Sequence, residues 1–287
     1  MKRIALILIA AMLLSNLYGC TPTQEAQIAA TTAPVYQFTS LLCQGTDITV
    51  SRLITEKVSC LHDYSLNVRQ VKSAEAADVI VISGGGLEDF MADVLSDQKV
   101  IDSSIGIELL GCNEHGHDGH HHEHDAHLWL SPAHAKIMAE NICGGLALQY
   151  PQHKAVFERN LADLHKQLDE LQAYGQTQLQ DLSCRELITF HDGFAYFAHA
   201  FDLTILEAVE EESGSEASAQ ELKRLIGVVE QHKLPAIFTE INGSISAANI
   251  IALQTGVQTY ELDMGMGNLD YFGAMRRNID TIKEALG

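Results

Sequence analysis

Basic residues are scarce in this 287-residue chain. Lys and Arg number 18 against 38 Asp and Glu, which gives a formal net charge of −20 at pH 7. Because phosphate binding depends mainly on Lys and Arg, this balance argues against a nucleic-acid partner. It suits a protein that handles cations, although acidity alone does not select one. Apolar residues make up 46% of the chain, which excludes an intrinsically disordered protein and allows a large core.

Long hydrophobic runs are also missing, apart from one near the N-terminus. Two basic residues precede an apolar run over 4–14, which is shorter than the roughly 20 residues of a transmembrane helix. The pattern is typical of a secretory signal peptide, and residues 17–20 are similar to a bacterial lipoprotein cleavage box. We expect a signal peptide over 1–19, a lipid on Cys20, a tether over 20–30 and an extracytoplasmic protein anchored to the bacterial cell membrane. The alternative is an ordinary signal peptide followed by an unmodified cysteine.

Paired cysteine motifs are absent as well. None of the five later cysteines belongs to a CxxC pair, so a thiolate zinc knuckle is not expected. Their odd number leaves at least one thiol unpaired or paired outside the chain, and we expect disulfides or buried apolar roles. Cys60, close to His62, and Cys112, beside a histidine-rich tract, stay open as metal ligands. The five are Cys43, Cys60, Cys112, Cys143 and Cys184.

Short apolar segments alternate with amphipathic ones along most of the chain. This alternation predicts parallel sheets covered by helices on both faces, and therefore an α/β fold. Strands are expected at 48–50, 78–82, 186–190, 203–209, 236–239 and 257–262. Helices are expected at 87–95, 193–200, 218–232, 245–254 and 271–286.

Two consecutive helices interrupt this alternation in the middle of the chain. Ser131 and Pro132 provide a cap and a first-turn proline for a helix to about residue 148. Pro151 opens a longer helix to about residue 182, with one apolar stripe along it. We predict two α/β lobes, 31–150 and 184–287, each with a mainly parallel sheet, joined by one long rigid helix over 151–183. An ordinary long surface helix is the alternative. The stripe consists of Phe157, Leu161, Leu164, Leu168 and Leu171.

The chain contains 14 histidines, and six of them lie in one polar tract. Residues 113–125 read NEHGHDGHHHEHD, which has no apolar residue and predicts a flexible loop. Imidazole suits zinc and copper better than calcium or magnesium, so we expect an auxiliary metal-binding loop. Ordering such a loop costs entropy, which keeps its affinity modest. A tract without a selected role is the alternative. The six are His115, His117, His120, His121, His122 and His124.

Three further histidines and one aspartate lie in ordered contexts. His127 precedes the only tryptophan and a helix start, while His62, His191 and Asp263 follow predicted strands. Ligands of open α/β sheets bind at the carboxyl ends of strands, so these four groups would meet in a cleft between the lobes. Three imidazoles and one carboxylate suit tetrahedral zinc. The remaining histidines, expected on helices in surface or packing roles, are His134, His153, His165, His199 and His232.

The same segments carry a resemblance to a known family. Taken in order, they resemble the zinc and manganese substrate-binding lipoproteins of ABC importers over nearly all of 31–286. The resemblance implies two lobes, a rigid linking helix and one metal held by His62, His127, His191 and Asp263. Histidine at 191 and the histidine-rich loop look like the zinc-preferring branch, since manganese-preferring members usually have a carboxylate there. The matching segments are 62–64, 77–87, 101–110, 113–125, 125–132, 190–197, 237–240 and 255–263.

The chain departs from the family pattern around several of these ligands. Prolines are missing beside His62 and at Ala126, and residues 264–266 read Met-Gly-Met instead of Pro-Leu-Gly. Glu240 is therefore an alternative fourth ligand, or a carboxylate that supports a ligand from behind, and Cys60 is a further candidate.

The resemblance implies a function without catalysis. We expect a monomeric, high-affinity zinc-binding protein that delivers Zn²⁺ to the membrane subunits of an ABC permease. A manganese or iron carrier, with Mn²⁺ in the site, and a surface adhesin are alternatives. A zinc hydrolase is a third class, because three histidines can leave a position open for water. The absence of an HExxH motif and the expected fourth ligand argue against it.

Overall fold

The computed structural model describes residues 26–56, 61, 64–111, 124–209, 217–241, 243–267 and 269–287. The expected signal peptide, Cys20, Cys60, His62 and residues 112–123 of the histidine-rich tract lie outside these ranges. Nowhere in the described ranges does a helix combine the length and the apolar character that crossing a membrane requires.

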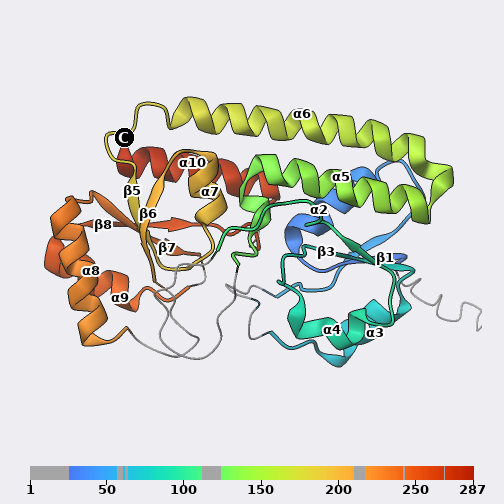
Figure 1. Ribbon diagram of the computed structural model, residues 1–287, viewed down its shortest axis with the longest axis horizontal. Coiled ribbons are helices and arrows are strands. Elements are labelled where there is room, and N and C mark those ends of the chain that lie inside the picture. Colours follow the sequence, from blue (N-terminus) through green and yellow to red (C-terminus); the bar gives the residue numbers. More distant parts are fainter. Residues whose placement is uncertain are drawn as a thin grey trace, which may run out of the picture.

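Two four-stranded sheets form the centres of two lobes (Figure 1). The first sheet has the order β2 (Val50–Arg52), β1 (Ile28–Ala30), β3 (Val79–Ile82) and β4 (Val100–Asp102). The second has the order β6 (Thr204–Ala208), β5 (Glu186–Thr189), β7 (Ala236–Glu240) and β8 (Gln258–Leu262). All strand pairs in both sheets are parallel, which confirms the predicted α/β class. Each sheet has its topological switch point at its centre, between β1 and β3 or between β5 and β7.

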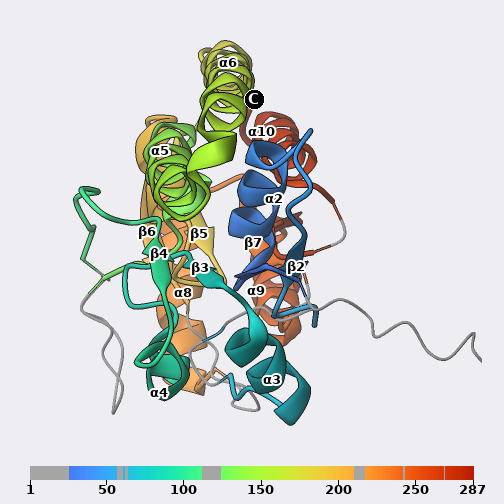
Figure 2. The ribbon, with the colours of Figure 1, turned by 90° about the vertical axis from the view of Figure 1, so that its right-hand side faces the viewer.

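Helices cover both faces of each sheet, as parallel sheets require. In the first lobe, α2 (Ala33–Leu42) and α5 (Pro132–Gln149) lie on one side, with α3 (Val68–Ala76) and α4 (Ala92–Leu95) on the other (Figure 2). In the second lobe, α7 (Ala195–Ala200) and α10 (Tyr271–Leu286) lie opposite α8 (Ala219–His232) and α9 (Ser246–Thr255) (Figure 1).

The predicted long helix is present as α6 (Lys154–Gln178), after a 3₁₀ turn η4 (Pro151–His153). It runs along the upper side of both lobes in Figure 1 and packs against α5 and α2 of the first lobe and α10 of the second. Four of the five stripe residues are fully buried, and only Leu161 is half-buried. Close packing also needs Gly175, where a Cβ atom would lie 2.2 Å from the Phe201 ring. The helix therefore joins the lobes by continuous contact along its length.

Several boundaries differ from the sequence-based expectations. Residues 28–30, expected in the tether, form the buried strand β1. The segment is too short and too alanine-rich to be predicted as a strand, and it becomes one by pairing with its neighbours in the sheet. The expected strand at 48–50 lies two residues later, as β2. The expected helix over 87–95 is a 3₁₀ turn η2 (Asp89–Met91) followed by the single turn α4. The sequence did not indicate α2, α3 or β4.

One large hydrophobic core crosses the boundary between the two lobes, and a second, smaller core lies within the second lobe. A single cluster of buried side chains includes Ile80 of the first sheet, Leu187 of the second, and Trp129 and Met264 between them. Phe38 of α2 meets Tyr271 of α10 edge to face, with ring centroids 4.9 Å apart. The lobes are therefore held together by side-chain packing as well as by α6.

Candidate metal centre

His127 lies on the first lobe, one residue before the 3₁₀ turn η3 (Leu128–Leu130). Its side chain is buried, and its ring is fixed from behind by Asp125. The Asp125 Oδ1 atom accepts the backbone N–H of His127 at 2.8 Å and lies 2.8 Å from His127 Nδ1. A carboxylate at Nδ1 favours the tautomer with its proton there, which leaves Nε2 able to bind a metal.

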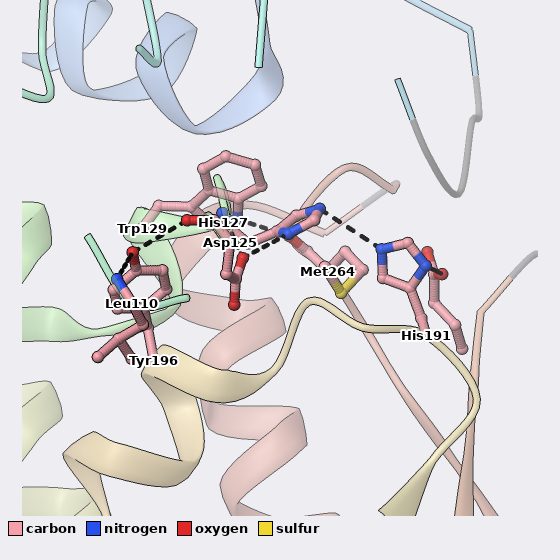
Figure 3. A network of polar contacts seen from close by, with 8 residues as sticks. Leu110, Asp125, His127, Trp129, His191, Tyr196 and Met264 are labelled. Carbon is pink, nitrogen blue, oxygen red and sulfur yellow. Dashed lines mark hydrogen bonds and ion pairs between the residues drawn. The ribbon is translucent and has the colours of Figure 1, made fainter. Parts of the chain in front are cut away.

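His191 follows β5 of the second lobe and faces His127. The two Nε2 atoms lie 3.5 Å apart, and both rings are buried (Figure 3). Behind His191, the Nδ1 atom lies 3.6 Å from Oε2 of Glu240, at the end of the neighbouring strand β7. Each histidine thus has a carboxylate on its outer nitrogen and directs its inner nitrogen at the other.

The distance between the two Nε2 atoms suits a shared zinc ion. Two nitrogens bound to one tetrahedral zinc at about 2.0–2.1 Å lie about 3.3–3.4 Å apart. The separation of 3.5 Å in the structure is close to that value. The two rings could therefore take the same ion with little movement of either lobe.

Glu240 and Asp263 bring two buried carboxyl groups to the second lobe's side of this pair. Burial, and to a smaller extent the nearby Asp263 carboxylate, raise the pKa of Glu240 to about 9. Asp263 follows β8 and is buried, with Oδ1 accepting the Gly265 N–H at 2.8 Å. Asn278 of α10 fixes the Asp263 backbone through two hydrogen bonds of 2.7 Å, one to its N–H and one to its carbonyl.

The structure brings together only part of the predicted ligand set. In the described ranges, no three His, Cys, Asp or Glu side chains form a group that could hold a metal ion. His127 and His191 meet as predicted, whereas Glu240 lies behind His191, which favours its supporting role over direct ligation. His62 lies outside the described residues, so its ligation and that of Asp263 stay predictions.

Trp129 links the segments that carry His127 and Asp263 across the lobe boundary. The indole Nε1–H donates to the Met264 carbonyl at 2.7 Å (Figure 3). The Tyr271 hydroxyl donates to the Trp129 carbonyl at 2.8 Å. The Trp129 ring lies edge to face with His127, with centroids 5.4 Å apart. The chain passes close to the His127 ring at Gly193, where a Cβ atom would lie 2.8 Å from His127 Nδ1, so only glycine fits there.

Tyr196 of α7 holds the base of the histidine-rich tract. Its hydroxyl donates to the Asp125 carbonyl and accepts the Leu110 N–H, both at 2.9 Å. Gly111 and the exposed His124 form an antiparallel bridge beside it. Five histidines expected in the auxiliary loop, His115, His117, His120, His121 and His122, lie outside the described residues.

The sequence reasoning did not assign roles to Asp125, Trp129, Gly193, Tyr196 or Asn278. Asp125 carried a usable signal, since an acidic residue stood two positions before an ordered histidine. Trp129 and Gly193 lie only two positions from His127 and His191. The contacts that give these two residues, Tyr196 and Asn278 their roles are with segments distant in sequence, so spacing could not reveal them.

The described cysteines lie in structural positions. Cys43 and Cys143 are buried free thiols, as one alternative expected, and Cys184 is a half-buried free thiol. Burial raises the pKa of the Cys43 thiol to about 12, so it is inert at neutral pH.

Comparison with known proteins gives relatives with metal-related names. The zinc-binding lipoprotein AdcA of Streptococcus pneumoniae is 29% identical over 309 residues, which covers 99% of this chain but only 61% of AdcA. A putative metal-binding protein of Treponema pallidum is 27% identical and covers 92% of this chain and 88% of its own length.

Solved structures of similar proteins share the fold. The crystal structure of ZnuA matches with a TM-score of 0.79 and 28% identity, covering 91% of this chain and all of ZnuA. A zinc-bound ZnuA deletion mutant matches with a TM-score of 0.78 and 29% identity, over 91% of this chain and 97% of its own. The model of the family described as ZnuA, zinc-uptake complex component A, periplasmic, matches residues 28–285. This match confirms the resemblance: the chain belongs to the ZnuA family of zinc-uptake components.

Proposed function

We propose that this protein is the extracytoplasmic binding component of an ABC importer, which binds Zn²⁺ with high affinity and delivers it to a permease. One observation carries the proposal: the buried Nε2 atoms of His127 and His191 face each other at 3.5 Å. The family description and the names of AdcA and ZnuA support zinc as the cargo. No catalytic step is required of the site.

We propose His127 and His191 as two of the zinc ligands, with His62 and Asp263 completing the tetrahedron. Asp125 and Glu240 would support the two imidazoles from behind. Nitrogen ligands favour zinc over manganese, which prefers oxygen. Manganese and iron carriage are alternatives that competition between metals would detect.

Metal titration of the protein purified without an affinity tag tests the site. We expect His127→Ala and His191→Ala each to remove the tight stoichiometric zinc site in calorimetry or chelator competition. His232→Ala is a matched control, because His232 lies on α8 and pairs with Glu186 at 2.9 Å. Unchanged tight affinity in His191→Ala would overturn the ligand assignment, and tighter binding of Mn²⁺ than Zn²⁺ would overturn zinc as the cargo.

Delivery and anchoring need measurements in cells. We propose that a lipid on Cys20 holds the protein at the membrane and that the histidine-rich loop improves zinc capture when supply is low. A Cys20→Ala variant should be lost from the membrane fraction. Deletion of 114–124 should leave tight binding intact but slow growth under chelation. Equal growth with and without these residues would contradict the proposed role of the loop.

A further inference from the structure

A buried carboxylate, Glu88, occupies the switch point of the first sheet. It accepts three hydrogen bonds from the ends of the two central strands. The Thr31 hydroxyl and the Ser83 N–H donate to Oε1 at 2.6 and 2.8 Å, and the Gly84 N–H donates to Oε2 at 3.0 Å. Glu88 is only 3% exposed, so water does not compete for these donors.

In open α/β sheets, this crevice is where ligands usually bind. Successive backbone N–H groups of a glycine-rich turn also commonly form a cradle for an anion. Here the chain's own carboxylate fills the cradle. The turn that follows β3 has three glycines with positive φ, namely Gly84 at +80°, Gly85 at +67° and Gly86 at +88°. This backbone course favours glycine, and the first two N–H groups of the turn bind the carboxylate.

The same turn lies close to the segment that carries His127. A Cβ atom at Gly85 would lie 3.5 Å from Leu128 Cδ1 and 3.8 Å from Ala126 Cα, the residues on either side of His127. The Gly85 N–H donates to the Ser104 hydroxyl at 3.1 Å, which fixes the turn from the β4 side. The position of the turn thus limits where the His127 segment can lie.

We propose that Glu88 is a positioning residue for the metal: its carboxylate holds the turn 83–86 in the shape that supports Ala126 and Leu128. This support keeps His127 Nε2 directed at His191. The inference rests on the proposed zinc function of the His127–His191 pair. It adds a residue that the ligand set does not contain and that lies in the core of one lobe.

The chemistry of the cradle calls for a carboxylate. The Thr31 hydroxyl and the Ser83 and Gly84 N–H groups are all hydrogen-bond donors. The two oxygens of a carboxylate accept all three bonds, and no donor faces another donor. Glutamine would replace one oxygen with an NH₂ group and set a donor against a donor. Glu88→Gln should therefore keep the side-chain shape and still disturb the turn.

Zinc affinity of Glu88 variants tests this proposal, with the exposed neighbour Asp89→Asn as the matched control. We expect Glu88→Gln to bind zinc about fivefold more weakly than wild type, within the range of about two- to thirtyfold for residues that act through packed neighbours. Glu88→Ala should bind more weakly still. Formate should restore part of its affinity by entering the vacated cradle, whereas chloride at equal ionic strength should not.

A double-mutant cycle makes the test independent of the alanine variant, should that variant not fold. Gly85→Ala strains the turn without touching Glu88, so its effect and that of Glu88→Gln should not be additive. Glu88→Gln binding within twofold of wild type, or independent effects of the two substitutions, would overturn the role of Glu88. Failure of the proposed function is distinguishable, because wild type itself would then lack a tight zinc site.

Discussion

At the scale of single residues, the carboxylates behind the two histidines decide what the rings can do. Asp125 touches His127 Nδ1 at 2.8 Å, and Glu240 lies 3.6 Å from His191 Nδ1. The Asp125 carboxylate orients the His127 ring and increases the basicity of its inner nitrogen, while the Glu240 carboxyl group contacts the His191 ring from behind. In the proposed zinc site, ligand strength therefore depends on residues that do not themselves face the metal.

The Asp125→Asn substitution tests that dependence. The amide keeps the shape but loses the charge and offers a weaker acceptor to the His127 ring. We expect zinc affinity to fall by about 10- to 100-fold, as when other outer partners of metal-bound histidines are removed. Chelator competition measures the change, with the exposed Asp93→Asn as control. Affinity equal to wild type would mean that Asp125 does not orient His127.

Glu88 should make the stability of the metal-free protein depend on pH. Burial raises the pKa of Glu88 to about 7, against the usual value of 4.5 for the unfolded chain, although its hydrogen bonds from Thr31, Ser83 and Gly84 stabilise the carboxylate and oppose the shift. The folded state therefore binds the proton of the Glu88 carboxyl group more tightly than the unfolded chain does. The extra free energy of unfolding from this proton is fully present below pH 4.5 and is lost as the pH rises through 7. The difference corresponds to about 3 kcal/mol.

Chemical denaturation at several pH values checks this expectation. Between pH 4.5 and 7.5, wild type should lose more unfolding free energy than Glu88→Gln, whose amide does not titrate. Parallel curves for the two proteins would show that Glu88 does not titrate in this range.

At the scale of helices and strands, the sequence predicted those elements that carry their own pattern. The apolar stripe from Phe157 to Leu171 indicated α6, and the β-branched run 79–82 indicated β3. Ile28–Ala30 carries no such pattern, because its strand conformation depends on pairing with β2 and β3. The sequence likewise predicted only that His127 and His191 would lie in a cleft between the lobes. It could not predict that their rings face each other, because the two residues lie on different lobes and are 64 positions apart in sequence.

The packing of α6 predicts opposite effects for two glycine substitutions. Gly175→Ala should lower the free energy of unfolding by about 1–3 kcal/mol, because the new methyl group would meet the buried Phe201 ring. Gly227 on α8 has open space around its Cβ position, so Gly227→Ala should raise the free energy of unfolding by about 0.5–1 kcal/mol through helix propensity. Denaturant unfolding measures both, and stabilisation by Gly175→Ala would contradict the close packing of α6.

At the scale of the whole molecule, the shared core and α6 make the two lobes one structural unit. Trp129 and Tyr271 add hydrogen bonds across the boundary, and the Trp129 ring contacts the His127 ring edge to face. This packing holds the His127 and His191 rings face to face across the two lobes, which limits the ordering cost of the proposed zinc binding.

Thermal unfolding tests this unity. We expect the metal-free protein to unfold in one transition, because no boundary through the core separates the lobes. Free zinc at about 100 times the dissociation constant should stabilise it by about 2.7 kcal/mol and move that single transition upward, and a chelator should reverse the shift. Two separate transitions, with only one responding to zinc, would contradict a shared core.

Trp129 gives the protein a built-in optical reporter. It is the only tryptophan in the chain, it is buried, and its ring lies 5.4 Å from that of His127. The extent to which an imidazole ring quenches indole fluorescence depends on the charge that the ring carries. An ion bound to His127 should therefore change the fluorescence of Trp129 alone. The proposed binding and release of zinc can therefore be tested in real time on the unlabelled protein.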